Sequence, residues 1–325
     1  MAAGLIARLR WLRQHALGIN RRNQDLLLRY NPPRLVSLVD HKLRTKDVLA
    51  EHQLAVPATY ARCARATRLV ELSAEMARRA DFVLKPARGA GGEGIVVIAG
   101  RDGDGFVKLS GARLTLRDLL AHAADIIGGA FSLSQTYDEV LLEQRLKNHP
   151  ALAPFCPAGV ADLRVVLLHG VPVMAMLRLP TIASDGRANL HVGGIGVGIE
   201  LASGRPCFGV CRDRPIERHP DTRQPLIDIG IPHWPEALRL AARAYDAIPL
   251  GFVGVDIVID ESLGPVILEL NARPGLSIQL ANRRGLRPPV RNLLLRTGTV
   301  PGTIGAEARV ALGVEMAQQE EGAWG

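Results

Sequence analysis

The sequence predicts an α+β protein, because strand and helix patterns follow one another in three stretches. Residues 81–98 have the pattern of a strand, a glycine-rich loop and a second strand, and a helical pattern follows over residues 115–127. From residue 162 the chain is rich in strands. A helical pattern over residues 235–248 then leads into a hairpin over residues 251–271. Hairpins pair antiparallel strands, so helices packed on antiparallel sheets are expected.

Length, composition and charge restrict the class of protein. The 325 residues are enough for two medium-sized domains or one large composite, and 47% apolar with 22% charged residues excludes a disordered or fibrous chain. The formal net charge of +8 indicates an anionic partner, such as nucleotide phosphates, an acidic substrate, nucleic acid or a lipid surface. A merely solubilising basic surface is the alternative. With 4% aromatic residues, nucleic acid bound by base stacking is not expected.

Cysteine spacing and hydropathy indicate a cytoplasmic protein. The four cysteines are too few and too irregularly spaced for a disulfide framework. A zinc site with Cys207 and Cys211 is disfavoured, since their spacing fits the known zinc patterns poorly. Arginines interrupt the apolar pattern of residues 1–24, unlike a signal peptide, and the longest apolar run, residues 165–176, is too short to span a membrane. We therefore expect no transmembrane segment.

The N-terminal segment, residues 1–31, has a helical periodicity that ends before two prolines. We interpret it as a helical extension that packs on the protein's own core. A docking helix and a membrane-surface helix are the alternatives. The apolar side of the helix consists of Leu5, Leu9, Leu12 and Ala16.

Polar residues interrupt the second strand of the final hairpin. If residues 261–264 form its loop, Asp260 pairs with Pro265, and counting back places Asp256 opposite Glu269. Directly opposed side chains lie about 5 Å apart, where like charges destabilise a sheet. A cation is therefore expected between the two carboxylates.

Magnesium is one explanation for this pair of carboxylates. Asn271 lies on the same face as Glu269, because strand side chains alternate. Magnesium is held by one or two carboxylates, with water and substrate phosphates in the other positions. Asp256, Glu269 and Asn271 are therefore the predicted metal ligands. The alternative is a strand-end salt bridge, for example between Glu269 and Arg273, and the hairpin alone does not decide between the two.

Lysines and a glycine-rich loop supply groups that suit phosphates. Lys85 ends an apolar strand, and the backbone N–H groups of the loop after it can fold over phosphates. Residues 38–57 predict a helix capped by Asp40, with Lys42 and Lys46 on one face. Surface lysines beside an ordinary glycine turn are the alternative. The loop lacks the Walker pattern; its glycines are Gly89, Gly91, Gly92 and Gly94.

A second glycine-rich span, residues 184–201, is interpreted as a long functional loop, because glycine permits close approach of the backbone to a ligand. It follows the strand-rich region that contains Arg164 and Arg178.

Taken in order, these elements resemble the ATP-grasp superfamily of carboxylate-amine ligases over residues 38–279. Lys42 resembles the family's first nucleotide lysine, and Lys85 with its glycine loop resembles the second lysine and the lid. Within the superfamily the sequence is most similar to alpha-L-glutamate-ligase-like, RimK-like and sugar-transfer-associated proteins. The stretch NARPGLSIQLAN supports this narrower similarity. The resemblance assigns the adenine hinge to Glu143, Gln144, Arg145 and Leu146.

The resemblance implies an ATP-grasp fold, in which two α/β subdomains with antiparallel sheets clasp the nucleotide. It implies a helical extension over 1–37, an N-terminal subdomain with the lid over 38–142, a C-terminal subdomain with the metal and acyl-phosphate site over 143–290, and a tail over 291–325. Only about 40 residues precede Lys42, whereas many relatives carry a full domain there. A partner protein or a second copy is therefore expected to complete the acceptor site.

The implied reaction joins a carboxylate to an amine with ATP and Mg²⁺, with Mn²⁺ as an alternative metal. The resemblance implies a donor such as glutamate and a small-molecule or peptide acceptor. A kinase with the same nucleotide cradle and a non-catalytic nucleotide-binding module are the rival interpretations. Gly193 and Gly194 would shape the acyl-phosphate pocket, and the implied catalytic residues are Arg164, Arg178, Asn189 and Arg273.

Overall fold

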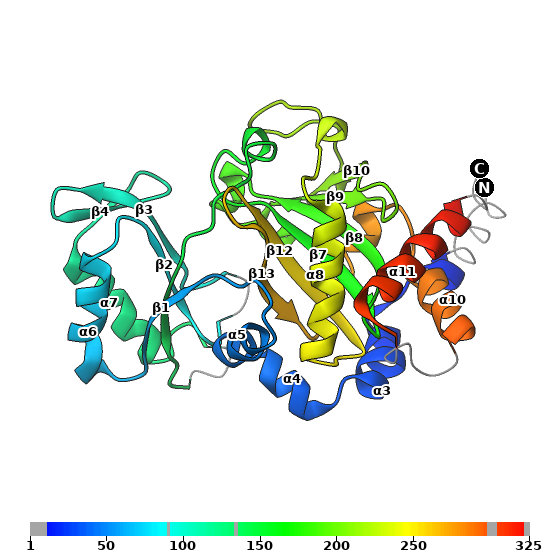
Figure 1. Ribbon diagram of the computed structural model, residues 1–325. Coiled ribbons are helices and arrows are strands. Elements are labelled where there is room, and N and C mark those ends of the chain that lie inside the picture. The colour runs from blue at the N-terminus through cyan, green and yellow to red at the C-terminus, as the bar shows by residue number, and fades with distance from the viewer. Residues whose placement is uncertain (1–11, 90–91, 133–135, 298–303, 322–325) are drawn as a thin grey trace.

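Two antiparallel sheets organise the computed structural model, which describes residues 12–89, 92–132, 136–297 and 304–321 (Figure 1). The six-stranded sheet has the order β1-β6-β2-β3-β4-β5 and the seven-stranded sheet the order β11-β10-β9-β8-β7-β12-β13. The first comprises β1 (Thr59–Cys63), β6 (Val140–Glu143), β2 (Phe82–Pro86), β3 (Val96–Asp102), β4 (Gly105–Lys108) and β5 (Arg113–Leu114). The second comprises β11 (Arg214–Pro215), β10 (Pro206–Cys211), β9 (Ile195–Ile199), β8 (Val171–Leu179), β7 (Asp162–Leu168), β12 (Phe252–Asp260) and β13 (Gly264–Asn271).

Helices cover both sheets (Figure 1). The α-helices are α2 (Ile19–Arg21), α3 (Leu28–Tyr30), α4 (Pro33–Val39), α5 (Lys42–Glu51), α6 (Leu69–Ala77), α7 (Leu116–Ile127), α8 (Trp234–Ala247), α9 (Ile278–Ala281), α10 (Arg287–Thr297) and α11 (Ala306–Glu321). A π-helix, η1 (Arg22–Leu27), joins α2 to α3. The 3₁₀ turns are η2 (Ala66–Arg68), η3 (Ala153–Phe155), η4 (Ile182–Ser184), η5 (Leu190–Val192) and η6 (Leu226–Asp228).

The smaller sheet packs α6 and α7 on one face. Leu72 of α6 and Leu119 of α7 are buried with Phe82 and Ile98 of the sheet. On the other face, Leu43 of α5 packs in a small cluster with Leu141 of β6 and with Ala87, the residue after β2. The predicted helix over 115–127 is present, and a capping box at Thr115 starts it.

The larger sheet is buried on both faces. Leu238 of α8 packs on the face that carries Val165 and Val255. The opposite face, with Val166, is covered by α9, α10 and the N-terminal segment. Because this sheet has a core on each side, its central strands are apolar almost throughout. Polar side chains within those strands therefore call for a specific explanation.

The described part of the N-terminal segment packs on the protein's own core, which is the interpretation preferred from the sequence. The side chain of Asn31 donates to the carbonyls of Phe252 and Ala272 and accepts from the Phe252 amide at 2.8 Å. The backbone of Leu17 exchanges two hydrogen bonds with the side chain of Gln279. Leu5 and Leu9, on the predicted apolar side, lie outside the described residues.

The region predicted as a tail, residues 291–325, contains most of α10 and all of α11. The α11 helix packs against α8 and β8. Its Arg309 is 1% exposed and donates to the Asp246 carboxylate and to the Ala242 carbonyl of α8. No helix among the described residues is long and apolar enough to cross a membrane.

The final hairpin corrects one sequence expectation and confirms another. Its turn is tighter than predicted, since Asp260 pairs with Gly264 rather than with Pro265. A β-bulge then leaves Leu268 as an extra residue on β13, and this restores Glu269 to the position opposite Asp256. The predicted pairing of the two carboxylates is therefore confirmed, although the loop count behind it was wrong.

Two further expectations were wrong. Asp40 does not cap α5, whose N-cap residue is His41 without a side-chain cap bond. The span 184–201 is only partly a loop, because residues 195–199 form β9, a buried strand. Its glycines serve packing: a Cβ on Gly198 would lie 2.2 Å from the carbonyl oxygen of Ala281 in α9.

This close approach predicts that Gly198→Ala destabilises the protein by about 1–3 kcal/mol, because the obstructing atoms belong to a backbone that cannot move aside. Gly230→Ala is the control, since a Cβ there meets nothing within 4 Å, and it should change stability by less than about 0.5 kcal/mol. Urea unfolding of both variants provides the comparison. Equal stability of the two variants would refute the packing explanation.

Candidate active site

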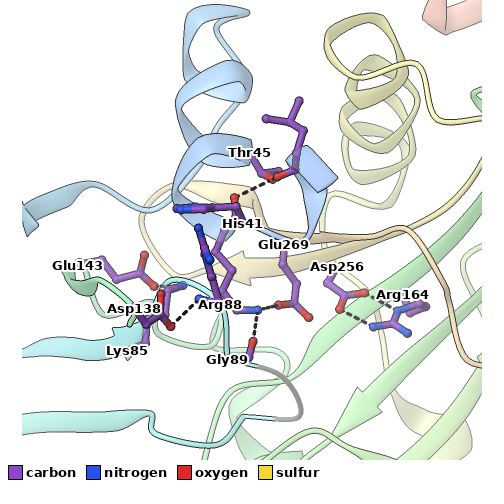
Figure 2. A network of polar contacts seen from close by, with 12 residues as sticks. His41, Thr45, Lys85, Arg88, Gly89, Asp138, Glu143, Arg164, Asp256 and Glu269 are labelled. Atoms are coloured by element: carbon purple, nitrogen blue, oxygen red, sulfur yellow. Dashed lines mark hydrogen bonds and ion pairs between the residues drawn. The ribbon is translucent and has the colours of Figure 1, made fainter. Parts of the chain in front are cut away.

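Two lysines of α5 connect the two sheets. Lys42 Nζ lies 3.1 Å from Glu269 Oε2 on β13, and it also donates to the Gly89 carbonyl at 2.9 Å. One helical turn later, Lys46 Nζ lies 2.5 Å from Glu143 Oε2 at the end of β6. Positions four apart share a helix face, as the sequence predicted. From this one face the helix reaches a carboxylate of each sheet, and Figure 2 shows Glu143 at the left of the network and Glu269 to its right.

Glu143 is shared by two lysines. Its side chain is 3% exposed and is paired with Lys85 of β2 as well as with Lys46. Burial acts to raise the pKa of Glu143, but the two ammonium groups outweigh burial and hold it below its usual value. Burial and the neighbouring Lys85 lower the pKa of Lys46. Two cations against one anion leave this buried cluster with a surplus of positive charge, which suits an anionic ligand.

The hinge predicted at Glu143–Leu146 connects the two sheets. Gln144 exchanges hydrogen bonds with the backbone of Ala58, and Arg145 donates to the Ala99 carbonyl. Leu146 is buried in a cluster with Val258 and Val266. Of these four residues, only Glu143 directs its side chain to the lysines. The other three instead fix the course of the backbone between the two sheets.

On the larger sheet, Asp256 is fully buried and is held by two arginines. Arg164 of β7 donates Nε to Oδ1 at 2.5 Å and Nη2 to Oδ2 at 2.6 Å. Arg178 of β8 donates Nη2 to Oδ2 at 2.6 Å. Gly254 leaves room for this arrangement, since a Cβ there would lie 3.0 Å from Arg164 Cδ. The two arginines together hold the Asp256 carboxylate in one orientation.

Arg178 also donates Nε to Asp162, its partner across β7 and β8. Burial raises the pKa of Asp162 to about 6, and the nearby Asp256 adds to that rise against the effect of Arg178. Asp256, in contrast, has a pKa lowered to about 2, because Arg164 and Arg178 outweigh its burial. Of the two carboxylates, Asp162 therefore takes up the first proton.

Glu269 and Asn271 are the more accessible oxygen donors. The side chain of Glu269 is 33% exposed, and Asn271 Oδ1 accepts a bond from the Arg273 amide. Within the described ranges, no three His, Cys, Asp or Glu side chains are grouped to hold a metal ion. A carboxylate and an amide beside Lys42 fit Mg²⁺, which takes few protein ligands and is completed by phosphates and water. Both oxygens of Asp256 already accept hydrogen bonds from arginine.

Arg273 does not balance Glu269, contrary to the alternative considered from the sequence. Its guanidinium makes a bidentate pair with Asp40, at 2.8 and 3.0 Å. The partner of Glu269 is Lys42. The Glu269–Arg273 pair is thus absent among the described residues, although Glu269 does form a salt bridge, and Arg273 instead ties the end of β13 to the turn between α4 and α5.

Glycine-rich loops of the two sheets meet beside this cluster. Gly92 and Gly94 have φ values of +83° and +72°, which favour glycine, whereas Gly91 lies outside the described residues. Asn189 caps η5 by accepting from the His191 amide. A Cβ on Gly194 would lie 2.8 Å from the Asn189 backbone, so the loop is closely folded here.

Two residues of the cluster were not predicted as site residues. Lys46 was recognised only as a neighbour of Lys42 on the helix, and Asp162 only as the start of the strand-rich region. The four-residue spacing signals Lys46 in the sequence. The pairing of Asp162 with Arg178 has a weaker signal, since it requires the β7–β8 register.

The fold and the paired charges describe a two-sheet protein with a cationic cluster between its sheets. The chain belongs to the sugar-transfer associated ATP-grasp family, whose model matches residues 21–294. This range contains both sheets, which constitute the ATP-grasp fold, and the ion pairs of the candidate site. A search of curated proteins found no match.

Solved structures resemble the chain at low sequence identity. ATP-grasp ligase PsnB, complexed with its minimal precursor, is 17% identical with a TM-score of 0.41, over 82% of this chain and 64% of PsnB. A biotin carboxylase complex with β-γ-ATP from Campylobacter jejuni is 15% identical with a TM-score of 0.48, over 77% and 44%. D-alanine–D-alanine ligase from Bacillus anthracis is 12% identical with a TM-score of 0.41, over 89% and 70%. The chain thus spans less than two thirds of PsnB.

The raised pKa of Asp162 predicts a pH-dependent difference between the wild type and Asp162→Asn. Folding raises this pKa from 3.8 to about 6, so the folded protein binds the proton more tightly than the unfolded chain between these pH values. The wild type's unfolding free energy, relative to the variant, is therefore highest below pH 4. It should fall by up to about 3 kcal/mol as the pH rises to 6.

Denaturant unfolding at intervals from pH 4 to pH 7 measures this difference. Asp256 remains ionised in both proteins throughout that range, because its pKa is about 2. Parallel stability curves for the two proteins would show that Asp162 does not titrate there.

Proposed function

We propose that the protein is an ATP- and Mg²⁺-dependent carboxylate-amine ligase that forms an amide bond through an acyl phosphate. The observation that carries the proposal is the position of α5, whose two lysines reach a carboxylate of each sheet. Two ammonium groups supplied from one face of a helix suit the phosphates of a nucleotide. Family membership supports ATP as that nucleotide.

The lysines would exchange carboxylate partners for phosphate oxygens. Lys42, with 23% of its side chain exposed, can turn from Glu269 to a phosphate at little desolvation cost. Lys46 and Lys85 are more buried, and they share one carboxylate between them. The hinge residues Glu143 to Leu146 would then hold the adenosine end of the nucleotide between the two sheets.

Glu269 and Asn271, with Asp256 behind them, would hold the metal ion. Bound there, Mg²⁺ would neutralise phosphate charge as the anionic acid approaches; Mn²⁺ can take the same oxygen ligands. Release of Lys42 frees Glu269 for this role. Asp256 is positioned by its two arginines and needs a rearrangement of those hydrogen bonds to contribute an oxygen.

The chemical difficulty is that an ionised carboxylate is a poor electrophile. In the proposed reaction a carboxylate oxygen of the acid attacks the terminal phosphorus of ATP and ADP leaves. The amine nitrogen then attacks the acyl carbon, phosphate leaves and the nitrogen loses a proton. Arg178 would stabilise charge on the transferring group, with Arg164 beside it. Asn189 and the backbone of Gly193 and Gly194 would bound the acyl-phosphate pocket.

Substrates and partners are proposed at the level of class. The acid would be an amino acid such as glutamate, and the acceptor a small molecule or peptide that supplies the amine. The exposed pair Asp40–Arg273 lies beside the metal strand and can contribute to the acceptor side. A partner protein or a second copy would complete that side, and the division at residues 37, 142 and 290 is proposed as the domain organisation.

Loss of the metal carboxylate provides the test. Glu269→Gln should lower ADP release by at least about 100-fold, because the amide carries no charge for the metal. Glu261→Gln is the matched control, since Glu261 lies at the far end of the same hairpin and 43% of its side chain is exposed. It should retain activity within about twofold.

The assay screens pairs of acids and amines for ADP release and measures product mass. Condensed product that requires both substrates supports the ligase. A stable phosphorylated product formed with one acceptor would instead identify a kinase. ATP binding without any turnover would identify a nucleotide-binding module.

A further inference from the structure

Arg187 and Arg212, beside the proposed site, differ in their surroundings from the three arginines of its ion pairs. Arg164, Arg178 and Arg273 each pair with an aspartate. Within the described part of the chain, Arg187 and Arg212 pair with no carboxylate. Among the residues that the structure describes, Arg187 Nε donates only to the Ser184 carbonyl, at 3.2 Å. Their charge is therefore available to an anionic ligand.

Both arginines lie against the glycine-rich loops that border the site. A Cβ on Gly92 would lie 3.1 Å from Arg187 Cδ, which places this side chain of the larger sheet's loop against the lid of the smaller sheet. A Cβ on Gly193 would lie 3.5 Å from Arg212 Nε. Arg187, two residues before Asn189, therefore lies against Gly92, and Arg212 lies against Gly193, four residues after Asn189.

The turn that carries Arg212 is strained. Cys211 pairs with Arg214 across β10 and β11, so Arg212 and Asp213 form a two-residue hairpin turn. Their φ values are 50° and 59°, a combination for which Asn-Gly is favoured. An arginine in this conformation is unfavourable, and such outliers gather at functional positions. Here the strained backbone brings Arg212 to Gly193.

The strand register relates Arg212 to Arg178. Arg178 of β8 pairs with Gly196 of β9, and the preceding residue of β9, Ile195, pairs with Cys211 of β10. Arg212 therefore follows β10 at the same end of the sheet as Arg178. An acid whose reacting carboxylate lies at Arg178 would extend toward Arg212 along this end.

Resting on the proposed function, we propose that Arg187 and Arg212 bind a second anionic group, a carboxylate or a phosphate, on the acid that the site activates. The planar guanidinium matches both groups, since each offers two oxygens to its N–H donors. Acids with a second charge are then preferred over neutral acids of the same shape.

Binding to matched pairs of acids tests this preference without relying on turnover. The pairs are L-glutamate with L-glutamine, L-aspartate with L-asparagine, and O-phospho-L-serine with L-serine. Each is titrated calorimetrically into the full chain with Mg²⁺ and a non-hydrolysable ATP analogue. At least one charged acid should bind about tenfold tighter than its neutral counterpart, and the successful pair distinguishes carboxylate from phosphate.

Variants then assign the preference to the two arginines. Arg187→Gln with Arg212→Gln should remove the preference, while Arg214→Gln, on the same hairpin, should retain it. Failure of every charged acid to bind, equal binding within every pair, or an equal loss in Arg214→Gln would overturn the proposal. A charge preference without ADP release in the presence of any amine would reject the ligase and leave the anion subsite standing.

Discussion

The arrangement of the molecule depends on the position of α5 between the two sheets. Lys42 pairs with Glu269 of one sheet and Lys46 with Glu143 of the other. The backbone supports this placement, because the Lys42 amide donates to the Ala87 carbonyl just beyond β2. Leu43 packs against the smaller sheet and Leu49 in the core of the larger one. A single helix therefore fixes where the cationic groups lie relative to both sheets.

A second constraint lies within the larger sheet, where Asp162, Arg178, Asp256 and Arg164 form a chain of buried charges. Burying four charged groups is costly, and apolar residues of similar size often stabilise a fold as well or better. Stability alone therefore gives no reason for this chain. The two positive and two negative charges cancel. These ion pairs therefore hold Arg178 in place without adding net charge to the candidate site. Reactive groups held by such supporting contacts are suited to catalysis.

The sequence predicted the parts of the site that depend on local spacing. Lys42 and Lys46 are one helical turn apart, and Lys85 ends a strand, so their directions follow from helix and strand geometry. The opposition of Asp256 and Glu269 was also predicted, although only a bulge at Leu268 makes it correct. A one-residue error in register turns the following side chains to the other face of the sheet. The prediction was correct only because the shorter turn and the bulge offset each other.

Long-range pairing could not be predicted. Arg164 reaches Asp256 because β7 lies beside β12, and Arg273 reaches Asp40 across 233 positions of the chain. Neither neighbour can be inferred from spacing. Glycines were also ambiguous, since those of residues 195–199 were assigned to a loop although Gly198 serves the packing of α9. A glycine that gives room to a neighbouring helix and one that gives room to a ligand look alike in a sequence.

The central claim, that the lysines of α5 and β2 together with Glu269 form a site for Mg²⁺ and ATP, is tested most directly by calorimetric titration of ATP. The titration is made into the full chain in the presence of Mg²⁺ and again in the presence of a chelator. We predict saturable binding of one nucleotide that Mg²⁺ strengthens by at least about tenfold. Absence of binding, or an affinity that is unchanged by Mg²⁺, would contradict it.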